Sequence, residues 1–122
     1  MTFYKVRLEL ARTDEFPEGS AAHGYELVAP LDAAGHLDEA VWRENRKRCV
    51  VRRFWAGEAD EKGELTRTRS KAWAFSYAPG EDDDEPLFRL DTHVIKQGDY
   101  ISIREHDGET LPFRIVRVQP LD

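Results

Sequence analysis

Cationic and aromatic side chains alternate along residues 49–77, where together they could hold an anionic partner. Guanidinium and ammonium groups pair with phosphates and carboxylates, and aromatic planes stack on nucleobases. We predict a basic and aromatic surface of this kind, made by the residues Arg52, Arg53, Trp55, Arg67, Arg69, Lys71 and Trp73. The alternative interpretation is that the aromatic side chains fill the core and the charged ones form an ordinary solvated face.

The charge of the chain is distributed unevenly. Residues 43–71 hold ten basic and five acidic side chains, a local charge of +5, so the rest of a chain with net charge -6 carries -11. Such asymmetry bears on partners and solubility and not on the fold. It favours an anionic protein partner, and nucleic acid stays as the weaker alternative because nucleic-acid-binding domains are commonly basic overall.

An acidic run from Glu81 to Glu85 is the only compositionally biased segment, and it is bounded by Pro79-Gly80 and Pro86. It could dock on the basic hairpin of another copy or of another protein, with association steered by charge. The simpler interpretation is a solubilising loop. Together with the loop from Thr13 to Gly24 it could also line the mouth of a barrel, which gives the alternative function of a small enzyme or small-ligand-binding barrel.

The histidines do not specify a metal site. Asp91 and His93 are expected on one strand face, and Asp38 lies two residues after His36, so a mixed carboxylate and imidazole site can be imagined. The chain has no cysteine pair and no HExxH spacing. We therefore predict no metal and no cofactor.

The sequence carries no specific catalytic signature. There is no GxSxG turn and no glycine-rich phosphate loop, and Cys49 stands in an apolar run as a small buried hydrophobe. The acids Asp91, Asp99 and Glu105 could serve a paired-carboxylate hydrolase, but many exposed acids are expected in a chain with 24 of them. Binding is therefore expected in preference to catalysis.

The compartment follows from the cysteine count and the absence of long apolar runs. A single cysteine allows no intrachain disulfide, which suits a reducing compartment. No leader-like start is present and no apolar run approaches the length of a membrane span of about 20 residues. We predict a cytoplasmic protein with no membrane partner.

The first part of the chain predicts two strands and a short helix. Phe3 to Leu10 alternates apolar and polar residues, as a strand with one wet side does, and a second strand is expected from Tyr25 to Leu31. The intervening Thr13–Gly24 segment has the composition of a loop. Asp38 is suited to cap the start of a short helix.

Two hairpins are expected in the rest of the chain. Cys49–Trp55 and Leu65–Tyr77 would form one, and because the second arm is long, we expect a bulge or bend near Ser70. Thr92–Val118 would form the other, with alternation from Tyr100, a turn at Asp107-Gly108 and a return strand beginning at Phe113.

These elements predict an all-β fold with one short helix. Antiparallel connections and the absence of helices between successive strands favour a single domain over residues 1–122, a small antiparallel barrel or half-open barrel of six to seven strands. The pattern from His93 to Val116, in which a Gly-Asp turn precedes alternating apolar residues, resembles that of small bacterial β-barrels. The resemblance implies a fold shared by OB-like, SH3-like and cradle-loop barrels and assigns no activity to any residue.

Overall fold

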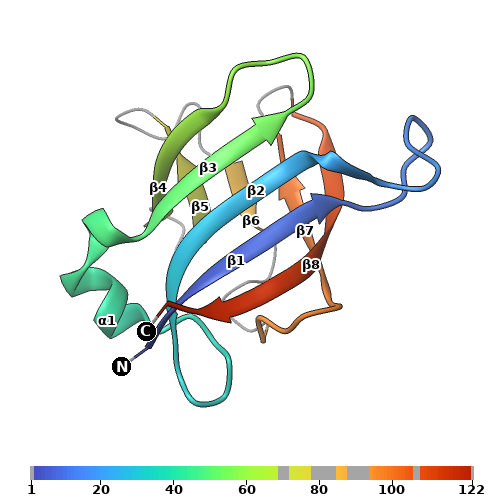
Figure 1. The fold of residues 1–122 in the computed structure, drawn as a ribbon. Coiled ribbons are helices and arrows are strands. Elements are labelled where there is room, and N and C mark those ends of the chain that lie inside the picture. The colour runs from blue at the N-terminus through green and yellow to red at the C-terminus, as the bar shows by residue number, and fades with distance from the viewer. Residues whose placement is uncertain (1, 69–71, 78–84, 88–93, 106–107, 122) are drawn as a thin grey trace.

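The computed structural model describes residues 2–68, 72–77, 85–87, 94–105 and 108–121, which form an antiparallel sheet that curls round into a small barrel (Figure 1). The elements are β1 (Thr2–Leu10), β2 (Ser20–Leu31), α1 (Glu39–Glu44), the 3-10 turn η1 (Arg46–Arg48), β3 (Val50–Trp55), β4 (Glu61–Arg67), β5 (Trp73–Ser76), β6 (Glu85–Leu87), β7 (Tyr100–Arg104) and β8 (Thr110–Pro120). Each strand pairs with the next, and β8 returns to pair with β1.

The predicted fold class is confirmed: the protein is mainly β, with one short helix and an antiparallel, half-open barrel. Within the described residues, seven strands have four residues or more, and β6 adds a strand of three. The β6–β7 seam is the weakest part of the wall, because Leu87 and Ile103 are its single described register pair. The resemblance to small β-barrels therefore holds at the level of a curled antiparallel sheet.

β1 and β2 form the first strand pair of the barrel, and the alternation of apolar and polar residues in β1 corresponds to a buried and an outer face. Val6, Leu8 and Leu10 of β1 are buried, as the sequence predicts. β2 is longer than predicted and takes up part of the expected loop, with a register shift opposite Glu9 and Leu10. A Cβ at Gly24 would lie 2.0 Å from the carbonyl oxygen of Leu8, so the close approach requires glycine.

The short helix closes one end of the barrel, which is called the base below. Asp38 caps α1 as predicted, because its carboxylate accepts a hydrogen bond of 3.2 Å from the backbone N–H of Val41. Trp42 faces the core, and its indole N–H donates to the carbonyl of Leu65 over 2.9 Å. The Trp42 ring also meets the edge of Trp73, with centroids 5.1 Å apart.

The prediction of one bent strand from Leu65 to Tyr77 was wrong. The chain reverses between Arg67 and Trp73, so β4 and β5 are separate antiparallel strands. Thr68 stabilises the reversal through two hydrogen bonds with Ala72. The backbone N–H of Thr68 donates to the carbonyl oxygen of Ala72 over 2.9 Å, and the Thr68 hydroxyl accepts from the backbone N–H of Ala72 over 3.2 Å. Side-chain bonding of this kind offers the backbone an alternative to continuing the strand, and alternation alone does not reveal it.

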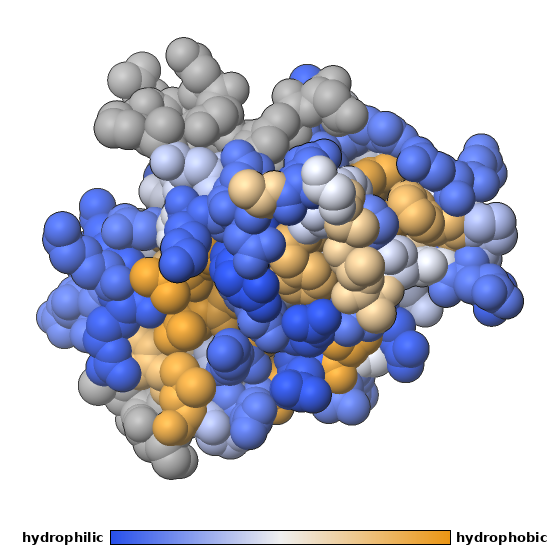
Figure 2. Space-filling view, turned by 45° about the horizontal axis from the view of Figure 1, so that its top comes forward, coloured by the Kyte–Doolittle hydropathy of each residue, from blue (hydrophilic) through white to orange (hydrophobic). Residues whose placement is uncertain are grey.

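Aromatic rings fill the centre of the barrel. The Tyr25 ring lies 4.9 Å from Phe75 and 5.2 Å from Phe113, and all three side chains are buried. Figure 2 shows hydrophilic side chains interspersed with apolar ones on one outer face. Within the described part of the chain, none of the helices is long and apolar enough to cross a bilayer.

Candidate functional site

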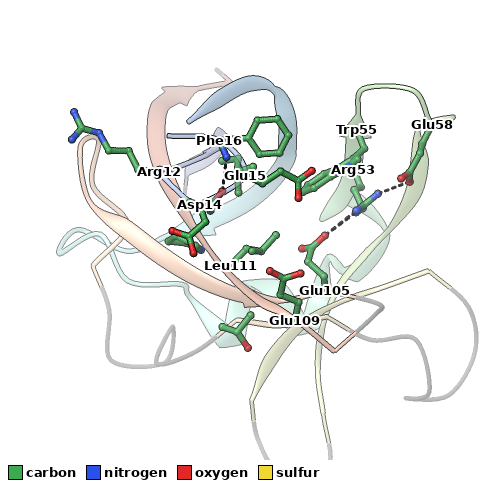
Figure 3. A pocket seen from close by; sticks show the side chains of 14 residues that line it. Arg12, Asp14, Glu15, Phe16, Arg53, Trp55, Glu58, Glu105, Glu109 and Leu111 are labelled. Carbon is green, nitrogen blue, oxygen red and sulfur yellow. Dashed lines mark hydrogen bonds and ion pairs between the residues drawn. The ribbon is translucent and has the colours of Figure 1, made fainter. Parts of the chain in front are cut away.

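A cavity of about 710 Å³ opens at the end of the barrel opposite α1, which is called the mouth below (Figure 3). It lies where β1 and β3 end and where β7 turns into β8. The lining residues are Leu10, Arg12, Thr13, Asp14, Glu15, Phe16, Arg53, Trp55, Glu58, Glu105, Glu109, Thr110, Leu111 and Pro112. The volume suits a small molecule, since ligand sites are commonly about 300–1,000 Å³.

A buried polar network forms the floor of this cavity. Arg53 and Glu105 are only 7% and 6% exposed, and Nη2 of Arg53 donates to Oε1 of Glu105 over 2.9 Å. Nε of Arg53 approaches the same oxygen at 3.3 Å. The hydroxyl of the fully buried Tyr25 donates to the other carboxylate oxygen of Glu105. Both carboxylate oxygens of Glu105 therefore accept hydrogen bonds, and the buried charges of Arg53 and Glu105 balance each other.

Carboxylates at the rim and an aromatic ring complete the surroundings of Arg53. Its Nη1 lies 3.3 Å from Glu58 and 3.6 Å from Glu61, and its guanidinium stands 4.2 Å from the centroid of the Trp55 ring. Burial alone would lower the pKa of Arg53, but the hydrogen bond and charge of Glu105 outweigh burial and raise it. Arg53 is thus a permanent cation.

Acidic side chains outnumber basic ones around the mouth. The lining includes five carboxylates and two guanidinium groups, a formal excess of three negative charges. The pair of Arg53 and Glu105 has no net charge, so the excess comes from the four acids Asp14, Glu15, Glu58 and Glu109 against the one cation Arg12, and Glu58 also contacts Arg53. Figure 3 shows carboxylates from the loop after β1 and from the β7–β8 turn on different sides of the hollow.

Aromatic rings form one wall of the mouth. The His23 ring packs between Phe16, at 4.7 Å, and Trp55, at 4.6 Å, and its Nδ1 lies 2.6 Å from Oγ of Ser20. Thr13 pins the loop, because its hydroxyl accepts from the Phe16 N–H over 3.0 Å. These contacts fix the loop after β1 against the end of β3.

Among the predicted site residues within the described ranges, Arg53 and Trp55 meet in the mouth. Arg52, their neighbour, is directed to the outer wall, where it pairs with Glu26 at 2.5 Å and with Asp60 at 2.8 Å. The difference follows from strand geometry, since successive side chains of β3 project to opposite faces of the sheet. The predicted surface is thus divided between two faces of β3.

Two of the other predicted residues, Arg67 and Trp73, belong to the base. Arg67 pairs with Glu39 at 3.1 Å and lies 4.7 Å above the ring of Trp73, which is 2% exposed and belongs to the core. Arg69 and Lys71 lie outside the described residues. Of the five predicted residues that the structure describes, two line the cavity, and binding of an anionic partner stays a prediction.

The sequence analysis identified some of the residues that line the mouth and missed others. The loop from Thr13 was expected at a barrel mouth and lies there, while residues 81–84 of the acidic run are outside the described residues. Glu105 was considered only as one acid among many, and its bond to Tyr25 joins positions 80 residues apart. No local pattern marks such a pair.

The remaining catalytic and metal candidates acquire no support from the geometry. Burial raises the pKa of the Cys49 thiol to about 11, which favours the protonated form at neutral pH, and the side chain is fully buried. Among the described residues, no group of three or more His, Cys, Asp or Glu side chains is placed to hold a metal ion. Asp91 and His93 lie outside those residues.

Comparisons with protein-family models, with curated protein sequences and with solved structures found no match to this chain. The cavity, its charges and its buried network are the features on which a function can be proposed.

Proposed function

We propose that this protein is a non-catalytic, small-ligand-binding barrel whose mouth takes an organic cation, with linear di- and polyamines as the best-fitting class. The observation that carries the proposal is the cavity of about 710 Å³, whose lining includes five carboxylates, two guanidinium groups and the aromatic rings of Phe16 and Trp55. Carboxylates and aromatic faces both bind ammonium ions in proteins.

The placement of the acids favours an extended cation over a compact one. Asp14 and Glu15 come from the loop after β1, Glu58 from the turn after β3, and Glu109 from the β7–β8 turn. Because the described acids do not converge into a metal-holding group, several separated ammonium groups match them better than one metal ion. A cavity lined by one sign of charge also concentrates oppositely charged ligands near its opening.

The predicted surface for an anionic partner remains a second proposal with less support. Arg52 and Arg67 are already engaged by carboxylates at 2.5 to 3.1 Å, so an anion would have to displace them. A labelled single-stranded oligonucleotide tests this alternative. Binding at low salt that weakens steeply as salt rises would favour it over the amine proposal, because phosphate contacts release counterions.

The amine proposal is tested by titration calorimetry with spermidine and putrescine, using citrate and glucose as the anionic and neutral probes. Spermidine is expected to bind more tightly than putrescine, and neither citrate nor glucose to bind. No heat with either amine at low salt, or tighter binding of citrate, would contradict the proposal.

A pair of matched variants locates the site. Asp14→Asn with Glu15→Gln removes two charges from the mouth, and we expect spermidine affinity to fall about tenfold, at roughly threefold to fivefold for each lost charge pair. Glu18→Gln is the control, because Glu18 is an exposed acid of the same loop that does not line the cavity. Because the control removes one charge and the mouth variant two, an equal loss of affinity per removed charge in both proteins would mean that the amine responds to net charge and not to the mouth.

A further inference from the structure

Three consecutive cations form an exposed basic turn at the base. Arg46, Lys47 and Arg48 make up η1, and each is solvent-exposed. The Arg46 guanidinium lies 4.7 Å from the centroid of Trp42, and that of Arg48 lies 3.9 Å from the centroid of Phe3. The rings hold both guanidinium groups in place without neutralising them.

The acids nearest in sequence do not compensate this turn. Glu39 is occupied by Arg43 at 2.7 Å and Arg67 at 3.1 Å, and Asp38 accepts the capping hydrogen bond of α1. Within the described part of the chain, no ion pair joins a cation of η1 to a carboxylate. Glu44 is the remaining acid of α1, so it and the basic turn together carry a formal charge of +2.

The basic turn and the acidic mouth lie at opposite ends of the barrel. β3 begins at Val50, directly after the turn, and ends at Trp55, which lines the mouth. A strand of its length spans about 20 Å. Figure 1 shows the same relation, with α1 at one end of the barrel and the loop after β1 at the other. One molecule therefore cannot bring its own turn into its own mouth.

We infer that this protein associates head to tail with copies of itself, the basic turn of one copy entering the acidic mouth of the next. The inference rests on the proposed function, because it treats the arginine-rich turn as a protein-borne organic cation. Three cations of η1 meet a mouth with a formal excess of three negative charges, and guanidinium groups form paired hydrogen bonds with carboxylates.

This contact has a definite consequence for assembly. The two surfaces differ, so each association leaves a free mouth at one end and a free turn at the other. Growth then continues along a line, unless the rotation between copies closes a ring. Because exposed charges dominate the contact, association is weakened by salt, whose screening length is about 10 Å at 0.1 M.

Sedimentation velocity over a concentration series tests the inference. At low salt the weight-average mass of the natural chain is expected to rise with concentration beyond that of a dimer, and at high salt to return to the monomer. A monomer at low salt throughout the series would overturn the inference.

Two charge-reversal variants make the test specific. The turn variant, Arg46→Glu with Lys47→Glu, keeps an intact mouth, and the mouth variant, Asp14→Lys with Glu15→Lys, keeps an intact turn. Each is expected to be a monomer alone, because its turn and its mouth then carry charge of the same sign, while an equimolar mixture is expected to associate through the intact turn of one variant and the intact mouth of the other. A mixture that stays monomeric would overturn the inference.

Controls separate this contact from general charge effects and from misfolding. Arg114→Glu with Arg117→Glu makes the same charge change on exposed positions of β8, and it should leave association intact. Loss of association in that control would overturn the inference. Circular dichroism checks folding, and Arg46→Ala with Lys47→Ala replaces the turn variant if the glutamates unfold the protein.

Spermidine titrated into the turn variant distinguishes the two proposals. Amine binding without self-association of the natural chain overturns only the head-to-tail contact. Self-association without amine binding overturns only the amine function, and the absence of both overturns both. If both hold, spermidine should also dissociate the oligomers, because it occupies the same mouth.

Discussion

The two ends of the barrel hold arginine in opposite ways. At the mouth, Arg53 is 7% exposed and is held by the buried Glu105, so its charge is balanced inside the protein. At the base, Arg48 is exposed and is held over the face of Phe3, so its charge still faces solvent. A buried cation needs an anion beside it, whereas an aromatic ring is sufficient to orient an exposed one.

Removing Glu105 is expected to have the largest effect, because the mouth depends on a balanced buried pair. Glu105→Ala leaves Arg53 and the Tyr25 hydroxyl without their shared acceptor, and unfolding free energy should fall by about 3 kcal/mol. The rim acids Glu58 and Glu61 keep the loss at the lower end of the range for broken buried pairs. Urea unfolding measures it, with Glu109→Ala as the comparison.

A small loss of unfolding free energy in Glu105→Ala would contradict the difference between the two ends of the barrel. It would mean that water reaches Arg53 and solvates its charge, as solvent does for Arg48. A loss equal to that of Glu109→Ala would have the same meaning, because surface substitutions usually change stability by about 0.5 kcal/mol or less.

The base should depend more on packing than on charge. Trp42→Phe removes the indole donor of the 2.9 Å hydrogen bond to Leu65 and part of the contact with Trp73, so we expect a loss of about 2 kcal/mol. Thermal and urea unfolding measure this loss. An equally large loss for Glu39→Gln would contradict the view that packing dominates at this end.

The ion pairs of Glu26 on the outer wall are expected to have an effect of intermediate size, and this effect depends on pH. The hydrogen bond from Arg52, at 2.5 Å, is the main reason that the pKa of Glu26 lies below its ordinary value, and a second bond comes from Arg7 at 3.0 Å. In the unfolded chain this carboxyl has its ordinary pKa of 4.5, and in the folded protein the pKa is lower. The stabilisation that the charged carboxylate gives is therefore complete above pH 4.5 and is lost as pH falls toward the folded-state pKa.

The stability difference between the natural chain and Glu26→Gln should therefore be on the order of 1 kcal/mol at about pH 7 and should shrink at about pH 3.5. Urea unfolding at both pH values measures it. A difference that grows on acidification would show that the folded state does not favour the charged form of Glu26.

The smallest effect is expected at the basic turn. Arg48→Ala removes a cation from the face of Phe3, and such exposed contacts contribute about 0.5–1 kcal/mol. Lys47→Ala is the matched control, expected to change the unfolding free energy by less than about 0.5 kcal/mol as surface substitutions usually do. Equal values for both variants would show that the ring holds Arg48 no more firmly than solvent does.

Much of the fold could be predicted because it depends on local patterns. The alternation in β1 places Val6 and Leu8 in the core, and the cap at Asp38 marks the start of α1. The reversal between β4 and β5 could not be predicted by the same means. An alternating sequence is compatible with one long strand or with two short ones, and the hydrogen bonds around Thr68 separate the two cases.

The candidate site likewise has features that the sequence predicts and features that only the tertiary structure reveals. By itself, the sequence determined a small, mainly β fold with uneven charge, and it left the Thr13 loop at either a barrel mouth or a sheet edge. Only the tertiary structure decided that Arg53 turns inward to Glu105 while Arg52 turns outward to Glu26. The physical reason is that barrel closure brings the ends of β3 and β7 together, and no local pattern encodes which charges then meet across the mouth.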